Sequence, residues 1–375
     1  MYSKTYTAPL ALAALLLATS AQAQEQVVRI GVSSPLSGAN AFAGKDNENG
    51  VRLAVEELNA KKLTIGGKPV RFELRAEDDQ GDPKAGVIVA QKFADAGVKY
   101  VLGPYNSGVA IPASRVYNDN GIVMSTVGTN PNITRSGYKR VFRIVASDTQ
   151  AGAAMAQYAA STLKLKNVGV IDDRTAFGQG VAMEFIKQAR KAGIKVAGHE
   201  YTTDKATDFA AILTKLKSNK VDAIFFGGYA PQAAPMARQM KALGLNAKLM
   251  GGDTLCSPEM AKLGGEAVGE NVLCAQGGAI LDRQAGGPAF EARYTQRFKR
   301  KPDVYAPSFY DQTMFIAQAM KTANSVDPAV VAQTMHKLTY KGVIGTYSYD
   351  AAGNMKQSAV TIYTFRNGAP VPVSK

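Results

Sequence analysis

Short strand-forming runs alternate with amphipathic helical segments along most of this chain, and this alternation restricts the folds open to it. Residues 27–34 (VVRIGVSS) have the composition of a strand, and apolar residues then recur at helical spacing over 51–58. A second strand pattern follows at 71–79. Strands separated by helices are typical of parallel sheets with helices on both faces. The sequence therefore predicts an α/β, doubly wound architecture.

The same rhythm restarts at about residue 141, which predicts a second sheet. Further strands are expected at 168–171, 195–201 and 223–227, with helices between them. A mature chain of about 350 residues also exceeds the size at which one hydrophobic core usually stops growing. We therefore expect two lobes of the same architecture.

The stretch 100–114 (YVLGPYNSGVAIPAS) joins a short strand to a glycine-containing turn and the start of a helix. Such a connection directs free backbone N–H groups and the positive end of a helix dipole to one point, which suits a carboxylate or a phosphate. An ordinary strand–helix connection without a ligand is the alternative.

Residues that follow the predicted strands carry hydroxyls, amides and aromatic rings. Ligands of open α/β sheets bind beyond the carboxyl ends of the strands. The residues at these positions are Ser37, Gly38 and Phe42; Tyr105, Asn106 and Ser107; Val127, Gly128, Thr129 and Asn130; residues 174–177, which include Phe177; Tyr229; and Asp253 with Thr254. Because the set combines hydroxyls and amides with one carboxylate, Asp253, it suits a small zwitterion.

Each of these candidates also has a purely structural interpretation. Ser107 and Asp253 are residue types that cap helices, and Thr129 would serve as a turn residue. Phe177 and Tyr229 would serve as core aromatics. Asp253 separates the two interpretations best, because a carboxylate that lines a closed cleft needs a cation.

The first 23 residues have the pattern of a cleaved secretory signal peptide. An apolar run over about 8–18 precedes the small-residue site Ala21-Gln22-Ala23, with Lys4 before it. The run is too short for a membrane span, and no cysteine beside the cleavage site indicates a lipid anchor. We expect an exported, soluble, periplasmic protein.

Two cysteines, Cys256 and Cys274, are the only ones in the chain. In an oxidising compartment, a pair of this kind is more often a disulfide than two free thiols. We therefore expect a Cys256–Cys274 disulfide.

The formal net charge of +14 raises the question of a nucleic-acid partner. The basic residues are scattered, and the densest cluster lies within 297–301. Since no basic motif interleaved with aromatics occurs, we expect no nucleic-acid partner.

Catalytic motifs are not found in the sequence. The two histidines, His199 and His336, fall in a predicted strand and a predicted helix, without metal-ligand spacing. No GxSxG elbow, phosphate-binding loop or complete GxGxxG follows a strand. The sequence therefore predicts a binding protein with no metal and no cofactor, rather than an exported enzyme.

Eight features in order resemble the leucine/isoleucine/valine-binding proteins of bacterial ABC transporters. They are the signal peptide, SPLSGANAFAG, EDDQGDPKAG, YVLGPYNSGVAIPAS, GTNPNIT, DDRTAFGQG, FFGGYAPQ and MGGDT. The resemblance implies two Rossmann-like lobes joined by three crossing strands, the type I periplasmic binding protein fold, with the ligand cleft between them. The expected lobes are 24–146 with 277–355, and 147–276 with 356–375.

The resemblance also implies roles for individual residues in one lobe. Ser107 and Thr129 match residues whose hydroxyls bind the ligand carboxylate. Gly128 matches a position that contributes backbone groups to the ligand head.

In the other lobe, Asp253 matches the acidic residue that pairs with the ligand ammonium. Tyr229 matches a tyrosine that closes over the ligand, and Phe177 matches an aromatic residue on the same wall.

Two departures from the family pattern bear on specificity. A family aromatic of the first loop falls on Ala43, and Phe42 beside it either takes that place or leaves a roomier pocket. A disulfide of the better-known member joins positions that match Gly81 and Asn106, so Asn106 and Tyr105 shape the carboxylate turn differently here.

The expected function is capture of a small amino acid, branched-chain aliphatic first, by closure of the lobes about a hinge near Ala146, Gln276 and Met355. A monomer would then deliver the ligand to an inner-membrane ABC permease. The alternatives are a sensory receptor of the same fold, or a binding protein for another solute such as an aromatic acid or an amide. A ligand without an ammonium group would have no use for Asp253.

Overall fold

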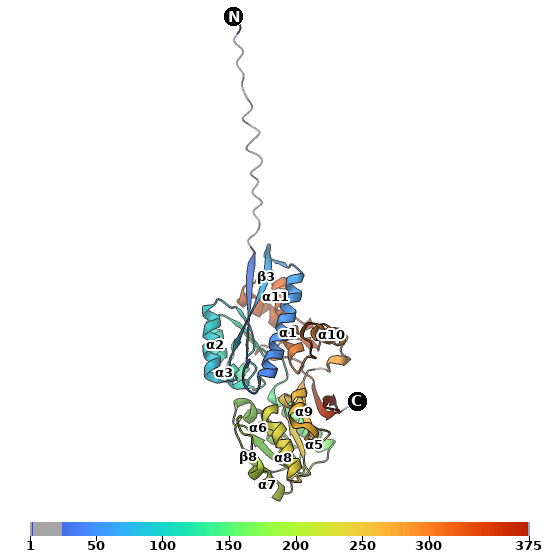
Figure 1. Ribbon diagram of the computed structural model, residues 1–375. Helices are drawn as coiled ribbons and strands as arrows, with labels where there is room; N and C mark the ends of the chain where they lie inside the picture. The colour runs from blue at the N-terminus through green and yellow to red at the C-terminus, as the bar shows by residue number, and fades with distance from the viewer. Residues whose placement is uncertain (1, 3–24, 279, 374–375) are drawn as a thin grey trace.

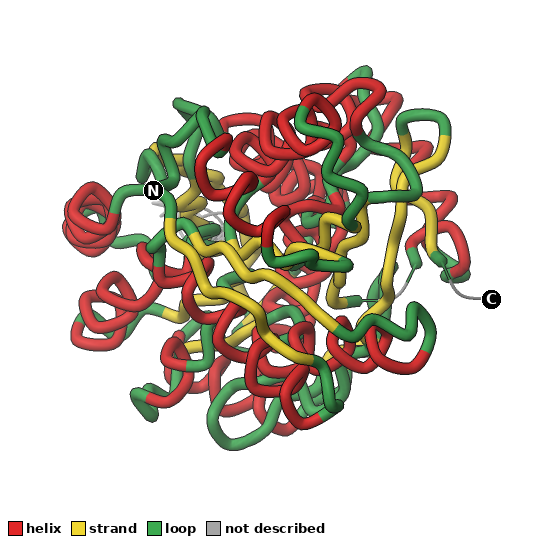
Figure 2. Tube along the Cα trace, turned by 90° about the horizontal axis from the view of Figure 1, so that it is seen from below, coloured by secondary structure: helices red, strands yellow, loops and turns green. Residues whose placement is uncertain are grey.

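The computed structural model describes residue 2 and residues 25–278 and 280–373. Two α/β lobes lie end to end along the long axis of the molecule (Figure 1). Seen along that axis, helices surround the strands (Figure 2). The doubly wound architecture predicted from the sequence is confirmed.

The first lobe is built on a six-stranded sheet of order β2-β3-β1-β4-β5-β6. All neighbours are parallel except β2 and β3. Its strands are β1 (Gln26–Ser34), β2 (Thr64–Ile65), β3 (Lys68–Asp78), β4 (Tyr100–Leu102), β5 (Val123–Thr126) and β6 (Val141–Arg143).

Helices from two distant parts of the chain cover this sheet. They are α1 (Ala41–Ala60), α2 (Pro83–Asp95), α3 (Ser107–Asp119) and α4 (Asn132–Arg135), and then η3 (Leu281–Arg283), α10 (Gly287–Phe298), α11 (Ala306–Ala323) and α12 (Pro328–Lys337), with the ribbon β12 (Tyr340–Lys341) and β13 (Thr346–Tyr347). Helix α1 packs against α11, which ties the beginning of the chain to its last third.

The second lobe is built on a seven-stranded sheet of order β15-β14-β11-β10-β9-β7-β8. Its strands are β7 (Asn167–Asp172), β8 (Lys195–Tyr201), β9 (Ala223–Gly227), β10 (Lys248–Gly251), β11 (Val272–Gly277), β14 (Val360–Arg366) and β15 (Ala369–Pro372). Its helices are α5 (Asp148–Ser161), α6 (Ala176–Lys191), α7 (Ala210–Ser218), α8 (Ala230–Ala242), η1 (Asp253–Cys256), α9 (Pro258–Gly264) and η2 (Gly265–Ala267). Strands β14 and β15 are antiparallel to their neighbours.

The chain crosses between the lobes three times: between β6 and α5, after β11, and before β14. The exact domain boundaries and the hinge positions stay predictions.

The expected signal peptide, residues 1–23, lies outside the described residues. Within the described part of the chain, no helix has the length and hydropathy needed to cross a bilayer.

Side chains cap the starts of two helices. Asp82 caps α2 by accepting hydrogen bonds from the amides of Lys84 and Ala85. Ser147 caps α5, in a capping box with Gln150. The carboxyl group of Asp148, the first residue of α5, is fully buried.

The two histidines have structural partners. His199 in β8 contacts the Asp172 carboxylate at 2.6 Å. His336 in α12 lies against the carbonyl oxygens of Asp350 and Lys139, at 2.9 and 3.1 Å.

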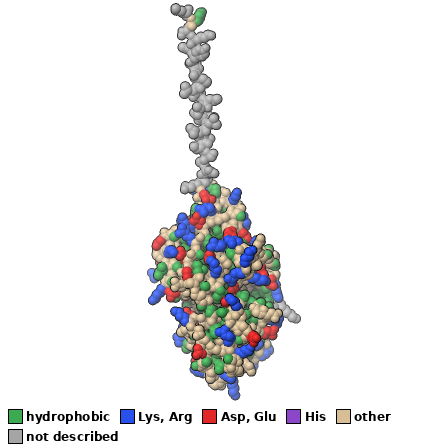
Figure 3. Space-filling model, in the orientation of Figure 1, with side chains coloured by type: hydrophobic (Ala, Val, Ile, Leu, Met, Phe, Trp, Pro, Cys, Tyr) green, Lys and Arg blue, Asp and Glu red, His purple; other side chains and the backbone are tan. Residues whose placement is uncertain are grey.

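The face of the molecule in Figure 3 carries basic side chains interspersed with acidic ones over both lobes, which agrees with a solvated surface charge.

A disulfide joins Cys256 at the end of η1 to Cys274 in β11, as the sequence predicts. Both residues are buried in the second lobe. The bond therefore ties the segment that begins with Asp253 to the centre of the sheet.

Replacing both cysteines by serine should destabilise the second lobe, because the bond closes a loop between residues 18 positions apart. We expect a loss of about 3 kcal/mol in the free energy of unfolding. Denaturant unfolding of wild type and variant under non-reducing conditions measures it. Thiol labelling of denatured, unreduced wild type should find no free sulfur, and two reactive thiols would contradict the bond.

Candidate ligand-binding site

A small cavity of about 10 Å³ lies between the two lobes. The first lobe lines it from the loops after β4 and β5 and from the start of α11, and the second lobe from the segments after β7, β9 and β10. The lining residues are Tyr105, Ser107, Val127, Thr129, Phe177, Tyr229, Asp253, Thr254 and Tyr305. The carboxyl ends of both sheets therefore meet at this cavity, which we call the head cavity.

A second cavity, also of about 10 Å³, adjoins the head cavity and shares Tyr105, Thr254 and Tyr305 with it. Its remaining lining residues are Phe42, Ala43, Asp46, Asn47, Ser257, Asp303 and Val304. Phe42 packs against the hydrophobic clusters of both lobes. We call this space the side cavity.

A larger hollow, about 500 Å³, lies at the opposite end of the second lobe, at the amino ends of its strands. Two of its polar side chains already have partners. The carboxylate of Asp222 accepts hydrogen bonds from the backbone N–H of Asn167, and the ammonium of Lys248 donates to the carbonyl of Glu270. Because ligands of such sheets bind at the carboxyl ends, we assign the site to the two interlobe cavities.

Ser107 is the first residue of α3, and its hydroxyl does not cap that helix. The oxygen instead accepts a hydrogen bond from the backbone N–H of Asn130 at 3.2 Å. Its proton is then free to be donated into the head cavity. The first N–H groups of a helix have no partner within the helix, so this corner of the cavity attracts an anion.

Arg143 fixes the loop that carries Thr129. It is 1% exposed, and its guanidinium donates hydrogen bonds to the carbonyl oxygens of Gly128, Thr129 and Asn130 and to the Thr134 hydroxyl. Sequence reasoning missed this residue because it lies at the end of a strand and points away from the cavity.

Gly128 does not line the head cavity, contrary to the expectation. Its N–H donates to the Thr126 hydroxyl at 2.8 Å, and its carbonyl oxygen accepts from Arg143. Both of its backbone groups are therefore occupied by the protein. Val127 lines the cavity in its place.

The Thr129 hydroxyl is buried between the head cavity and the Asp148 carboxyl group. It lines the head cavity and also interacts with the Asp148 carboxyl group, whose pKa it lowers. Burial raises the pKa of Asp148 to about 8, and nearby Asp253 adds to the rise. Thr129 and Arg143 oppose it.

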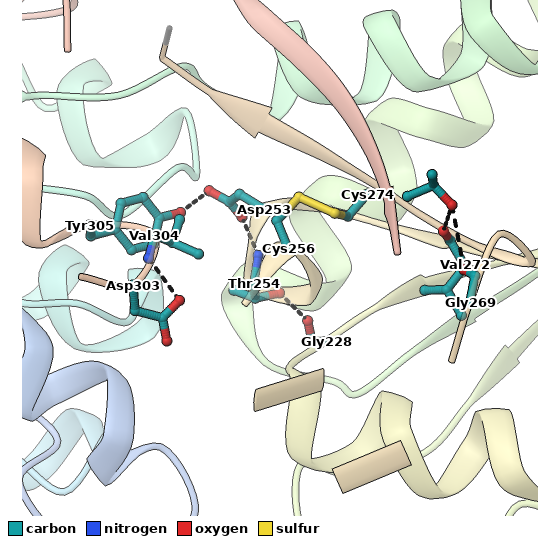
Figure 4. Close-up of a disulfide and its surroundings, with 11 residues drawn as sticks. Gly228, Asp253, Thr254, Cys256, Gly269, Val272, Cys274, Asp303, Val304 and Tyr305 are labelled. Carbon is teal, nitrogen blue, oxygen red and sulfur yellow. Dashed lines mark hydrogen bonds between the residues drawn. A yellow bond between two sulfur atoms is a disulfide. The ribbon is translucent and has the colours of Figure 1, made fainter. Parts of the chain in front are cut away.

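Asp253 begins η1 and is 4% exposed. One carboxylate oxygen accepts from the backbone N–H of Thr254 at 3.0 Å, and the other accepts from the hydroxyl of Tyr305 in the opposite lobe (Figure 4). Burial raises the pKa of Asp253 to about 6, against the lowering effect of the Tyr305 hydrogen bond. The group is therefore predominantly ionised at pH 7.

Aromatic rings from both lobes form one wall of the head cavity. The ring of Tyr105 lies 6.1 Å from that of Tyr229 across the lobes and 5.9 Å from that of Tyr305. Phe177 lies 5.2 Å from Tyr229. All four rings are buried. They exclude water, which strengthens the electrostatic interactions of Asp253.

Two other expected residues lie outside the head cavity. Asn106 is the residue before α3, and its side-chain oxygen faces Gly81. Phe42 lines the side cavity only. The expected residues that do meet in the head cavity are Tyr105, Ser107, Val127, Thr129, Phe177, Tyr229, Asp253 and Thr254, and the structure adds Tyr305.

The chain belongs to the periplasmic binding protein family, whose sequence profile matches residues 27–369. The Leu/Ile/Val-binding protein homolog 1 of Brucella abortus is 37% identical over 344 residues, 91% of each chain. The leucine-, isoleucine-, valine-, threonine-, and alanine-binding protein of Pseudomonas aeruginosa is 31% identical over 347 residues, again 91% of each. The crystal structure of a leucine-binding protein, LivK, from Thermotoga maritima superposes with a TM-score of 0.85 at 27% identity and covers 92% of this chain and 98% of its own. The family consists of substrate-binding proteins, not enzymes.

The buried carboxyl group of Asp148 predicts a pH-dependent stability. Its pKa in the folded protein, about 8, lies above the ordinary value of 3.8, so folding takes up a proton. The contribution of protonated Asp148 to the free energy of unfolding is fully present below about pH 4. It is lost as the pH rises through 8. Asp148→Asn should match wild type at pH 4 and exceed it at pH 8 by roughly 1 kcal/mol or more.

Thermal unfolding from pH 4 to pH 8 measures this difference. The exposed residue Asp95 provides the matched control, since Asp95→Asn should leave the pH profile unchanged. If the stability of Asp148→Asn followed pH in parallel with that of wild type, folding would not raise the pKa of Asp148.

Proposed function

We propose that this protein captures an amino acid between its lobes, with leucine, isoleucine and valine as the preferred class, and delivers it to an inner-membrane ABC permease. The observation that carries the proposal is the head cavity. It brings two hydroxyls of one lobe, Ser107 and Thr129, opposite a buried carboxylate of the other, Asp253. A zwitterionic head group complements this distribution of charge.

The ligand carboxylate would lie at the start of α3. There it would accept hydrogen bonds from Ser107, from Thr129 and from backbone N–H groups of the first turn. Its ammonium group would pair with Asp253. Hydrogen bonds to charged groups contribute about 1.5–3 kcal/mol each, so a few of them are sufficient for specific binding.

The ligand side chain would enter the side cavity. Phe42, Ala43 and Val304 present apolar surface there. The side cavity measures only about 10 Å³ with the lobes in contact, so it would have to widen as the lobes part to admit an aliphatic side chain. The ligands in the names of the Brucella and Pseudomonas relatives support the same class.

Binding would close the lobes about the hinge near Ala146, Gln276 and Met355, because a ligand shifts a conformational equilibrium only by contacting the favoured state more strongly. Besides the Tyr305–Asp253 contact, two further direct hydrogen bonds already cross the interface. The Asn130 amide donates to the Ala176 carbonyl at 2.7 Å, and the Ser257 hydroxyl donates to Asp303 at 2.7 Å. We further propose that the mature protein works as a periplasmic monomer.

Asp253→Asn should weaken leucine binding at least 10-fold, because the amide cannot neutralise the ligand ammonium. Calorimetry with purified mature protein measures the affinity after a thermal-shift panel of amino acids has identified the preferred one. Asp222→Asn, at the far end of the same lobe, is the matched control and should bind as wild type does. Undiminished affinity of Asp253→Asn would refute the ammonium assignment.

Ser107→Ala should weaken the same ligand by about 1.5–3 kcal/mol, the contribution of a hydrogen bond to a charged group. Ser114 lies in the same helix and donates to the Ile111 carbonyl, away from the cavity. Ser114→Ala should therefore leave the affinity unchanged. Equal affinities for the two variants would mean that Ser107 has only a structural role.

A further inference from the structure

Tyr305 connects the two lobes at the one carboxylate of the head cavity. It lies immediately before α11 in the first lobe, and its hydroxyl donates to Asp253 of the second lobe (Figure 4). Both side chains are 4% exposed. Tyr305 also lines both cavities, so it lies where the head and the side chain of a ligand would join.

This contact changes what Asp253 requires of a ligand. A buried carboxylate without hydrogen-bond donors is costly, which is why the sequence led us to expect a ligand cation beside it. In the structure each oxygen of Asp253 already accepts one hydrogen bond, from Thr254 and from Tyr305. Both donors belong to the protein, and neither carries a charge.

The Tyr305 hydroxyl remains a donor throughout the physiological range. Burial raises its pKa well above the ordinary value, and the negative charge of Asp253 raises it further. The lobes can therefore meet with Asp253 satisfied when no amine is present.

We propose that Tyr305 is a specificity-determining residue that lets the cleft close on aliphatic carboxylates of amino-acid size that lack an amine. The inference rests on the proposed function, since it uses the same carboxylate corner at Ser107 and Thr129. A ligand of this kind would fill that corner and the side cavity and would leave the Tyr305–Asp253 hydrogen bond in place. An amino acid would add its ammonium to the remaining acceptor capacity of Asp253.

The test compares leucine with 4-methylpentanoate, which is leucine without the amine. We expect wild type to bind both, with 4-methylpentanoate weaker by roughly 10- to 150-fold, the contribution of one hydrogen bond between charged groups. Tyr305→Phe should weaken 4-methylpentanoate by a further factor of about 10 or more, because Asp253 loses a donor that this ligand cannot replace. Leucine, whose ammonium replaces it, should change less than about threefold.

Tyr310→Phe is the matched control. Tyr310 also donates to a carboxylate, Glu57, at 2.6 Å, but both groups belong to the first lobe and neither lines either cavity. Its removal should alter thermal stability and leave the ratio of the two dissociation constants unchanged. The ratio separates a role in specificity from a role in folding, because a merely destabilised protein loses both ligands together.

Three outcomes would overturn the inference. In the first, wild type binds leucine but not 4-methylpentanoate. In the others, Tyr305→Phe lowers the affinity for both ligands equally, or lowers the affinity for neither. Wild type that binds 4-methylpentanoate but no amino acid would contradict the proposed function and leave the role of Tyr305 intact. Wild type that binds neither would contradict both.

Discussion

A carboxylate buried between two bodies must receive hydrogen bonds when those bodies meet, and the interlobe site of this protein depends on that constraint. Asp253 reaches the interface at the end of a central strand of the second lobe, anchored by the disulfide three residues later. Its donors come from both sides: Thr254 beside it and Tyr305 opposite. Tyr305 lies immediately before α11. The position of this helix is therefore linked, through the Tyr305 hydroxyl, to the carboxylate of Asp253 in the other lobe.

The opposite half of the site is organised by a buried positive charge. Arg143 donates to three successive carbonyl oxygens of the loop after β5, and so holds Thr129 at the cavity without touching the cavity itself. The same loop faces Asp148, whose raised pKa keeps much of it protonated near neutral pH. The corner proposed to receive the ligand carboxylate thus carries less negative charge than its composition suggests.

Most of the fold and much of the site could be predicted because both follow local rules. The strand–helix rhythm determines two parallel sheets, and Ser107, Thr129 and Asp253 follow strands directly. Tyr305 could not be found in this way, since no strand precedes it and only the packing of α11 on α1 brings it to the cleft. The role of Gly128 stays a prediction, and its backbone contacts with Thr126 and Arg143 are ones that sequence spacing does not reveal.

The threefold passage of the chain between the lobes has a consequence for how the molecule is made. The first lobe lacks α10, α11 and α12 until residue 337 has been synthesised, and the second sheet lacks β14 and β15 until residue 372. Neither lobe can complete its sheet and helices before almost the whole polypeptide is available, so the lobes cannot be finished one after the other as independent domains commonly are.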